Sequence, residues 1–310
     1  PDHLGEYGVD TVEKMAAVKG RVLRAARHAV ALNADDPLVL SLRKDCRAAR
    51  EILFAAKGRN AEIEAQLRSG GAALVLEPAG RGGSEMLYLQ GGRREVIAAA
   101  EELPSVFGGH APHNAENALC AAGLAVGMGQ ELETIRRALT AFKPDMEDSP
   151  GRLSFIEGLP FGLLIDFAHN PGQLEVLTRF AGRFGAAGRR ICLMTVGGNR
   201  SEAHVEACGR AVAGHFDRYI CYERQDLLRG RKRGEIAGLL RRGMIDGGVA
   251  ASAIEAGPDI WEAVERAVDL AEEGDFIVIL ATAWPSLVPA FRRAVARRFP
   301  DWRPPRKRSV

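Results

Sequence analysis

The second half of the sequence alternates regularly between short apolar runs and longer amphipathic stretches, and this alternation restricts the fold more than any other feature. Apolar runs rich in Val, Ile and Leu are typical of strands buried on both faces of a sheet. Strands and helices in alternation predict a largely parallel sheet with helices on both faces, a doubly wound α/β domain. The predicted strands are residues 153–156, 161–165, 190–196, 218–222, 250–254 and 276–281, and the predicted helices are residues 172–184, 202–215, 234–242, 259–273 and 286–298.

The apolar run at residues 161–165 gives way abruptly to the polar residues Asp166, His169 and Asn170, followed by Pro171. Open α/β sheets bind ligands at the carboxyl ends of their strands, so this segment is a candidate ligand site. Pro171 lacks a backbone N–H and suits the first turn of the next helix. A core strand followed by a capped helix would give the same pattern, so the pattern alone leaves both interpretations open.

Two more loops follow predicted strands. In the first, Gly197 and Gly198 would allow a close backbone approach to an anion, and Ser201 is a predicted helix cap. The second, residues 223–235, is strongly charged, and its carboxylates would suit the planar fork of a guanidinium. A solvated, charged loop is the alternative interpretation. The acidic candidates are Glu223, Asp226 and Glu235, and the candidate anchors for a substrate carboxylate are Arg229 and Arg231.

The first half of the sequence predicts a small sheet with helices. Thr11 is a predicted cap for a helix over residues 14–26, and Asp35 or Asp36 is a predicted cap for a helix that begins at Pro37. Glycine-rich turns separate several of the short apolar runs. The predicted strands are residues 29–32, 52–56, 70–76, 86–90 and 94–98, and two further helices are predicted over residues 118–126 and 132–141.

The segment His113-Asn114-Ala115-Glu116-Asn117 opens one of these helices. Asn114 and Asn117 are three residues apart and so share a helix face. Their amides can both donate and accept hydrogen bonds, as reading an adenine edge requires. An asparagine that caps the helix is the alternative.

Composition restricts the class of protein. A chain of 310 residues has room for roughly two domains. Its net charge of +2 implies no nucleic-acid or membrane partner. The five cysteines are scattered and form no CxxC pair, which indicates reduced thiols in a cytoplasmic protein. Residues 299–310 are a predicted basic tail, for which solubility is the first interpretation and contact with an acidic polymer the second.

Several motifs resemble those of the Mur ligase family of ATP-dependent amide ligases. They are PGR at residues 150–152, D-x-A-H-N-P at residues 166–171, HNAEN at residues 113–117, DHLG at residues 2–5 and NADDP at residues 33–37. The resemblance implies that residues 1–149 are the later part of a P-loop-type ATPase central domain. It also implies that residues 150–298 form the Rossmann-like C-terminal domain of this family.

The resemblance implies roles for single residues. In the family, the histidine that His3 matches helps to hold a magnesium ion. The lysine that Lys19 matches is carbamylated in several members, and the anion so formed binds metal. Both residues are therefore catalytic and metal-site candidates, although a solvated lysine is the alternative for Lys19. The nucleotide-site candidates are His113, Asn114, Asn117, Arg152, Asp166, His169 and Asn170, with Asp166 expected at the ribose.

The sequence departs from the family in one respect. The family's phosphate-binding loop, G-x-x-G-K-[ST], does not occur, since residues 80–84 and 195–200 are glycine-rich but lack its lysine. In the family that loop lies upstream of the DHLG-like motif. The resemblance therefore predicts that this chain is the downstream part of a ligase, and that alone it does not hydrolyse ATP.

The string D-L-x-R-G-R-x-x-G-E at residues 226–235 is most similar to the cyanophycin-synthesising members of the family, which add arginine to an aspartate polymer. The implied function is an ATP- and Mg²⁺-dependent carbon–nitrogen ligase that works through an acyl phosphate. Asp226, Arg229 and Arg231 are its candidate substrate residues. The implied partners are ATP, an amino acid and an acidic peptide or polymer, and a homo-oligomer is left open. The alternatives are a muropeptide or folylpolyglutamate ligase, or an inactive binding or assembly fragment.

Overall fold

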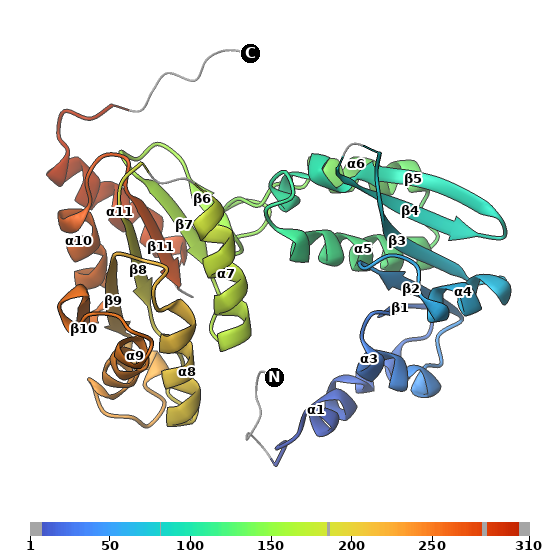
Figure 1. The fold of residues 1–310 in the computed structure, drawn as a ribbon, viewed down its shortest axis with the longest axis horizontal. Coiled ribbons are helices and arrows are strands. Elements are labelled where there is room, and N and C mark those ends of the chain that lie inside the picture. The colour runs from blue at the N-terminus through green and yellow to red at the C-terminus, as the bar shows by residue number, and fades with distance from the viewer. Residues whose placement is uncertain (1–7, 81, 185–186, 281–283, 304–310) are drawn as a thin grey trace. The chain divides into compact units, whose positions relative to one another are not determined.

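The computed structural model describes residues 8–80, 82–184, 187–280 and 284–303 (Figure 1). The chain divides into two compact units, Pro1–Lys143 and Pro144–Val310. Each unit has its own sheet, and each is described by itself below. His3 and most of the predicted tail lie outside the described residues.

The N-terminal unit has a five-stranded sheet in the order β1-β2-β3-β4-β5. Strands β1, β2 and β3 are parallel, and β4 and β5 extend the sheet in antiparallel fashion. The strands are β1 Ala29–Asn33, β2 Arg50–Ala55, β3 Ala72–Pro78, β4 Ser84–Gln90 and β5 Arg93–Ala99.

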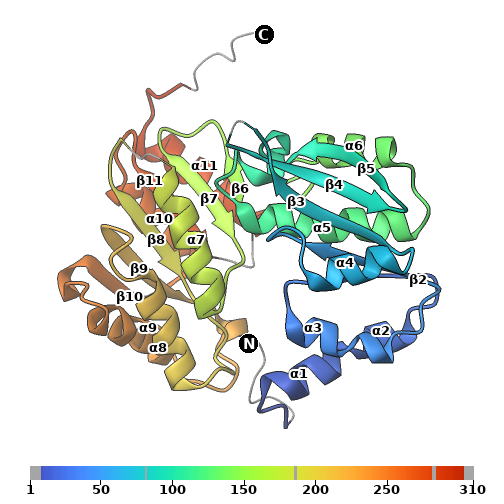
Figure 2. The same cartoon turned by 45° about the vertical axis from the view of Figure 1, so that its right-hand side comes forward.

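Helices cover both faces of this sheet (Figure 2). Ala115, Leu119 and Ile135 bring α5 and α6 onto one face, and Ile63 brings α4 onto the other. Helices α1 and α2 have no buried residue. The α-helices are α1 Val12–Lys19, α2 Arg21–Ala25, α3 Pro37–Ser41, α4 Ala61–Arg68, α5 Pro112–Gly127 and α6 Leu132–Ala141.

The expected elements of this unit are largely confirmed, with three differences. The helix expected over residues 14–26 is interrupted at Gly20, which ends α1. Helix α4 was not expected. Helix α5 begins at Pro112, without a side-chain cap, so Asn114 lies in its first turn and does not cap it. The cap at α3 comes from Asp36, whose carboxylate accepts the Leu38 N–H.

The C-terminal unit has a six-stranded sheet in the order β10-β9-β8-β11-β7-β6. All neighbouring strands are parallel except β6 and β7, which form an antiparallel pair at one edge. The strands are β6 Ser154–Ile156, β7 Gly162–Asp166, β8 Arg190–Met194, β9 Arg218–Glu223, β10 Ile254–Asp259 and β11 Phe276–Leu280.

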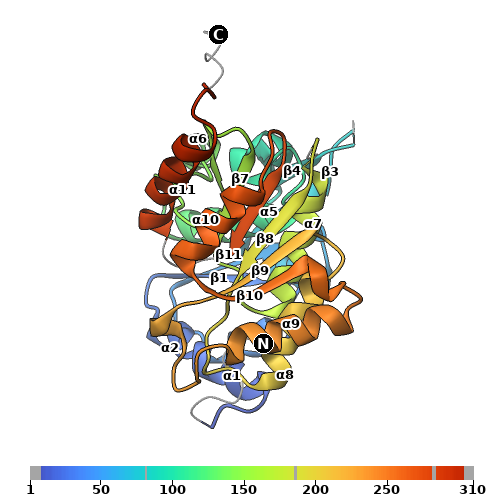
Figure 3. The ribbon, with the colours of Figure 1, turned by 90° about the vertical axis from the view of Figure 1, so that its left-hand side faces the viewer.

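Helices α7, α8 and α9 contact one another in succession, and α10 contacts α11. Figure 3 shows the two groups on opposite sides of the strands. Ile220, Ile277 and Phe291 belong to the core between the sheet and the α10–α11 layer. This is the doubly wound arrangement that the alternation predicts. The helices are α7 Pro171–Arg183, α8 Glu202–Val212, α9 Glu235–Asp246, α10 Ile260–Leu270 and α11 Trp284–Arg298.

The strand expected at residues 250–254 is present but shifted toward the C-terminus. Residues 251–253 form a short 3₁₀ helix, and the strand β10 begins only at Ile254. Strand β10 contains Gly257 and Pro258, which argue against a strand in a sequence pattern. It lies at the edge of the sheet, where a proline that cannot donate to a neighbouring strand is tolerated.

Among the described helices, none combines the length and the apolar character needed to cross a membrane.

Candidate functional site

The carboxylate of Asp166 lies at the carboxyl end of β7 and is almost fully buried, with 9% of its surface exposed. Its Oδ1 accepts the Ala168 N–H at 2.7 Å and its Oδ2 accepts the Leu153 N–H at 2.8 Å. Burial raises the pKa of Asp166, whereas these N–H groups and the nearby Arg152 act in the opposite direction. The carboxylate thus joins the end of β7 to the segment that precedes β6.

The segment before β6 is held in an unusual backbone conformation. Leu153 has a φ of +48°, a region that non-glycine residues rarely adopt. The buried Ser154 hydroxyl accepts a hydrogen bond from the Gly151 N–H at 2.9 Å. It donates one to the Ser149 carbonyl oxygen, also at 2.9 Å. These bonds direct the Leu153 N–H toward Asp166 and leave Arg152 exposed.

Arg152, from the PGR motif, lies beside the D-x-A-H-N-P motif. Its guanidinium carbon lies 4.8 Å from the centre of the Phe167 ring. The His169 ring lies 4.9 Å from the Phe167 ring on the centroid distance, and its Nδ1 is 2.9 Å from the Phe167 carbonyl oxygen. The Asn170 side chain accepts the Gln173 N–H and caps α7, with Pro171 at the first position of that helix. The structure therefore gathers Arg152, Asp166, His169 and Asn170 at one end of β7.

The loop after β8 and the loop after β9 are bound tightly to each other. The Gly198 N–H donates to the Leu227 carbonyl at 2.8 Å. A Cβ atom at Gly198 would lie 2.0 Å from the Leu228 carbonyl oxygen, so only glycine fits there. Arg231 donates to the carbonyl oxygens of Gly198 and Arg200, each at 2.9 Å. The backbone of the loop after β9 thus occupies the space beside Gly198 that an anion was expected to approach.

The acidic residues of the loop after β9 differ in burial and in the contacts that they make. Glu223 is buried, and its carboxylate accepts the N–H groups of Gly234 and Ala237 at the start of α9. The Asp226 side chain is 62% exposed and forms an ion pair with Arg224 at 2.7 Å. Asp226 is therefore accessible to a ligand, whereas Glu223 holds the helix.

In the N-terminal unit, the HNAEN residues occupy the first turns of α5. Asn114 donates to the Ser105 carbonyl at 2.7 Å and accepts from the Asn117 amide at 3.1 Å. The Nδ1 atom of His113 is buried and has no hydrogen-bond partner in the described structure, and burial lowers the pKa of this histidine. Glu116 accepts the Asn33 amide at 2.6 Å, which ties α5 to the end of β1.

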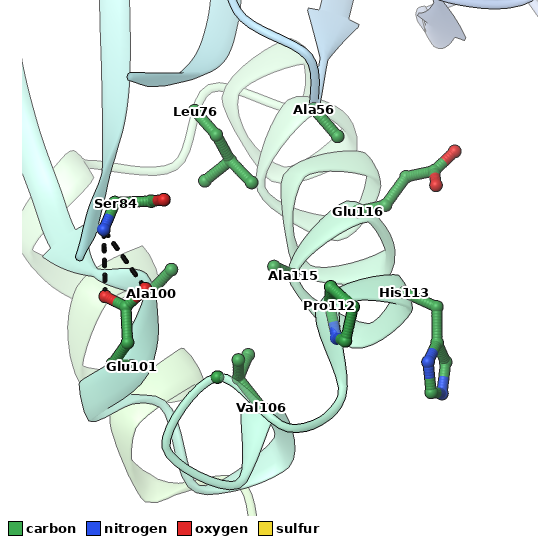
Figure 4. A pocket seen from close by; sticks show the side chains of 11 residues that line it. Ala56, Leu76, Ser84, Ala100, Glu101, Val106, Pro112, His113, Ala115 and Glu116 are labelled. Carbon is green, nitrogen blue, oxygen red and sulfur yellow. Dashed lines mark hydrogen bonds between the residues drawn. The ribbon is translucent and has the colours of Figure 1, made fainter. Parts of the chain in front are cut away.

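His113 and Glu116 also line a cavity of about 500 Å³ in this unit (Figure 4). Ala56, Leu76 and Val106 form part of its apolar wall. Figure 4 shows the His113 ring and the Glu116 carboxylate extending away from the opposite wall, where Glu101 accepts the Ser84 N–H. The start of α5 thus faces a hollow at the carboxyl end of the parallel strands, where ligands of such sheets bind.

The metal-site candidates are not assembled in the described structure. Lys19 is exposed at the end of α1, and His3 lies outside the described residues. Within the described ranges, no three His, Cys, Asp or Glu side chains come together as ligands for a metal ion.

Sequence reasoning missed three residues that shape these sites. Ser154 fixes the loop before β6, Phe167 lies against Arg152, and Glu116 lines the cavity. Phe167 and Glu116 lie inside the motifs D-x-A-H-N-P and HNAEN, so their positions in the sequence could have marked them as candidate site residues. Ser154 gave none, because its bonds depend on a positive φ at the preceding residue.

The sequence was compared with protein families and with curated proteins. Residues 151–282 match the family model described as Mur ligase, glutamate ligase domain. A cyanophycin synthetase from Crocosphaera subtropica is 33% identical over 281 residues, which are 90% of this chain and 31% of that protein. A UDP-N-acetylmuramoyl-L-alanyl-D-glutamate–2,6-diaminopimelate ligase from Aquifex aeolicus is 28% identical over 54% of this chain and 32% of that protein. The chain thus spans about a third of the length of these curated relatives.

A solved structure of E. coli FolC in complex with DHPP and ADP has the same fold, with a TM-score of 0.63 and 14% identity. It covers 96% of this chain and 60% of the FolC chain. The fold likeness extends over both units, whereas the family model matches residues 151–282, within the second. Residues 151–282 therefore carry the glutamate ligase domain of the Mur ligase family, and the chain is similar to a cyanophycin synthetase over 90% of its length.

Proposed function

We propose that this chain is part of an ATP-dependent ligase that joins a carboxylate to the amine of an amino acid through an acyl phosphate. The observation that carries the proposal is the geometry at Asp166, a buried carboxylate held at the end of β7 beside an exposed arginine. In this proposal residues 1–149 are the later part of an ATPase domain, residues 150–298 are the C-terminal domain and residues 299–310 are a basic tail.

Asp166 is suited to hold the ribose of ATP. Its two oxygens accept the N–H groups of Leu153 and Ala168, and a carboxylate has further acceptor capacity. A ribose offers hydroxyl donors to such a carboxylate. Arg152 lies at the same strand end, where its guanidinium suits a phosphate. His169 and Asn170 complete this part of the proposed nucleotide site.

Within the N-terminal unit, the proposed nucleotide-binding residues lie at the start of α5. Asn117 is exposed, and its carbonyl oxygen is free of the bond that its amide makes to Asn114. His113 and Asn114 support this turn. His3 and Lys19 remain proposed catalytic and metal residues. When bound, Mg²⁺ would offset negative charge on the phosphates.

The finer proposal is that the amine belongs to arginine and that the acid belongs to an aspartate polymer. The supporting observations are the likeness to cyanophycin synthetases and the loop after β9. Asp226 is exposed enough to exchange its Arg224 partner for a substrate guanidinium. Arg229 donates to the Asn199 side chain and can turn to a substrate carboxylate, while Arg231 holds the loop. We place the protein in the cytoplasm.

The test is a ligase assay with the protein that contains this chain. ADP release should require both arginine and an aspartate-rich peptide, and mass spectrometry should show one arginine added per side chain. Diaminopimelate and glutamate serve as competing amines. Turnover with either of these in place of arginine would assign the chain to muropeptide or folylpolyglutamate ligation. No turnover with any amine would favour a binding or assembly role.

A further inference from the structure

The loop at residues 223–235 carries more positive than negative charge, and its carboxylates are already engaged. Asp226 accepts two hydrogen bonds from Arg224, at 3.0 and 2.7 Å. The nearby Glu202 and Glu235 both lie close to Arg231, at 3.6 and 4.0 Å. Glu223 is buried under the start of α9. The loop therefore has no carboxylate left for its remaining cations.

Those remaining cations are Arg229, Lys232 and Arg233, and all three are exposed. Arg229 donates to the neutral Asn199 side chain at 2.6 Å. Within the described residues, no carboxylate lies within ion-pair distance of any of the three. Some exposed arginines of this unit do have an acidic partner, such as Arg266 with Glu255 at 2.9 Å.

The backbone that carries these cations is fixed in advance. Arg229 and Gly230 both have positive φ, at +47° and +94°. The Arg231 side chain donates hydrogen bonds to two carbonyl oxygens of the loop after β8. A ligand that binds here does not have to order the loop, and this lowers the entropic cost of binding.

We propose that Arg229, Lys232 and Arg233 form a binding surface for an acidic peptide, whose side-chain carboxylates pair with the three cations. Guanidinium groups pair bidentately with carboxylates, and Lys adds a mobile point charge. The inference deepens the proposed function and rests on it only in naming this peptide as the carboxylate substrate. Residues 223–235 contain no aromatic side chain on which a base could stack, and this favours an acidic peptide over a single-stranded nucleic acid.

The experiment measures the anisotropy of a fluorescent poly-L-aspartate peptide titrated with the 310-residue chain, without ATP. The test variant combines Lys232→Ala with Arg233→Ala. The matched control combines Arg266→Ala with Arg297→Ala, which removes the same charge from exposed residues that already have acidic partners. Thermal melting of each variant confirms that it is folded.

The proposal predicts that the loop variant raises the Kd about tenfold or more, that the control changes it less than about twofold, and that salt weakens binding. Equal weakening by both variants, or no binding by the unmodified chain, would overturn it. Equally tight binding of an oligothymidylate of the same charge would overturn it in favour of nucleic acid. Because the assay needs no turnover, peptide binding without ligation would contradict only the proposed function.

Discussion

Asp166 and Asp226 both lie at the carboxyl ends of strands in the same sheet, but one is buried and the other is exposed. Asp166 ends β7, is 9% exposed and receives two backbone N–H groups. Asp226 follows β9, has a 62% exposed side chain and contacts Arg224, two residues before it. The Asp166 carboxylate stabilises the fold and also belongs to the proposed site. The Asp226 carboxylate is accessible to a ligand and contributes little to the fold. Function at Asp166 therefore cannot be altered without a cost in stability.

The largest effect is expected for Asp166→Ala, which leaves the buried N–H groups of Leu153 and Ala168 without an acceptor. We expect the C-terminal unit to lose about 2–6 kcal/mol of unfolding free energy, since each of the two unpaired groups costs about 1–3 kcal/mol. The tryptophans, Trp261, Trp284 and Trp302, all lie in this unit, so their fluorescence during guanidinium denaturation reports its unfolding. An unchanged denaturation midpoint would contradict the described role of Asp166.

A smaller effect is expected where the loops after β8 and β9 meet. Gly198→Ala would bring a Cβ against the Leu228 carbonyl oxygen, and overpacking of this kind costs about 1–3 kcal/mol. Gly238→Ala in α9 is the control, because a Cβ there meets no atom within 4 Å. It should stabilise the unit by about 0.5–1 kcal/mol. The two changes should therefore move the fluorescence midpoint in opposite directions, and the same direction for both would refute the close contact.

In the N-terminal unit, we expect a pH effect from His113. Burial lowers the pKa of His113 below its usual 6.5, so the unfolded chain takes up the proton first as the pH falls. The stability that depends on neutral His113 is complete above pH 6.5 and is lost as the pH falls through the lowered pKa. Hydrogen exchange of the α5 amides should show this loss, and His113→Gln should remove part of it. Equal pH dependence in both proteins would contradict the assignment.

The smallest effect on stability is expected for Asp226→Ala. Its exposed ion pair with Arg224 is worth at most about 1 kcal/mol, and a surface change of this kind is usually within about 0.5 kcal/mol. The fluorescence midpoint should therefore stay close to that of the unmodified chain. A shift as large as that of Asp166→Ala would remove the contrast between the two aspartates.

Periodicity and helix caps predicted most of the architecture, because they depend on neighbouring residues. The strand that ends at Asp166 and the caps at Thr11, Asp36 and Ser201 all belong to this local class. Helix α4 escaped prediction because its inner face includes the polar Gln66, which is buried by bonds to Arg43 and to the Glu51 carbonyl.

The site could be predicted less completely than the fold. The motif at residues 166–171 predicted that Asp166 follows a buried strand, and Asp166 is the last residue of β7. That Glu223 would cap α9, or that Arg231 would bind carbonyl oxygens across two loops, depends on contacts between segments far apart in the sequence. Charge alone could not separate these structural residues from Arg229 and Asp226.

The most direct test of the account is steady-state kinetics of Asp166→Asn and Asp226→Asn in the protein that contains this chain, assayed for the proposed ligation with ATP and the amino acid varied in turn. We predict that Asp166→Asn raises the KM for ATP at least about tenfold and leaves that for the amino acid nearly unchanged, and that Asp226→Asn does the reverse. Equal effects of each variant on both substrates would contradict the division of this sheet edge into a nucleotide end at β7 and an amine end after β9.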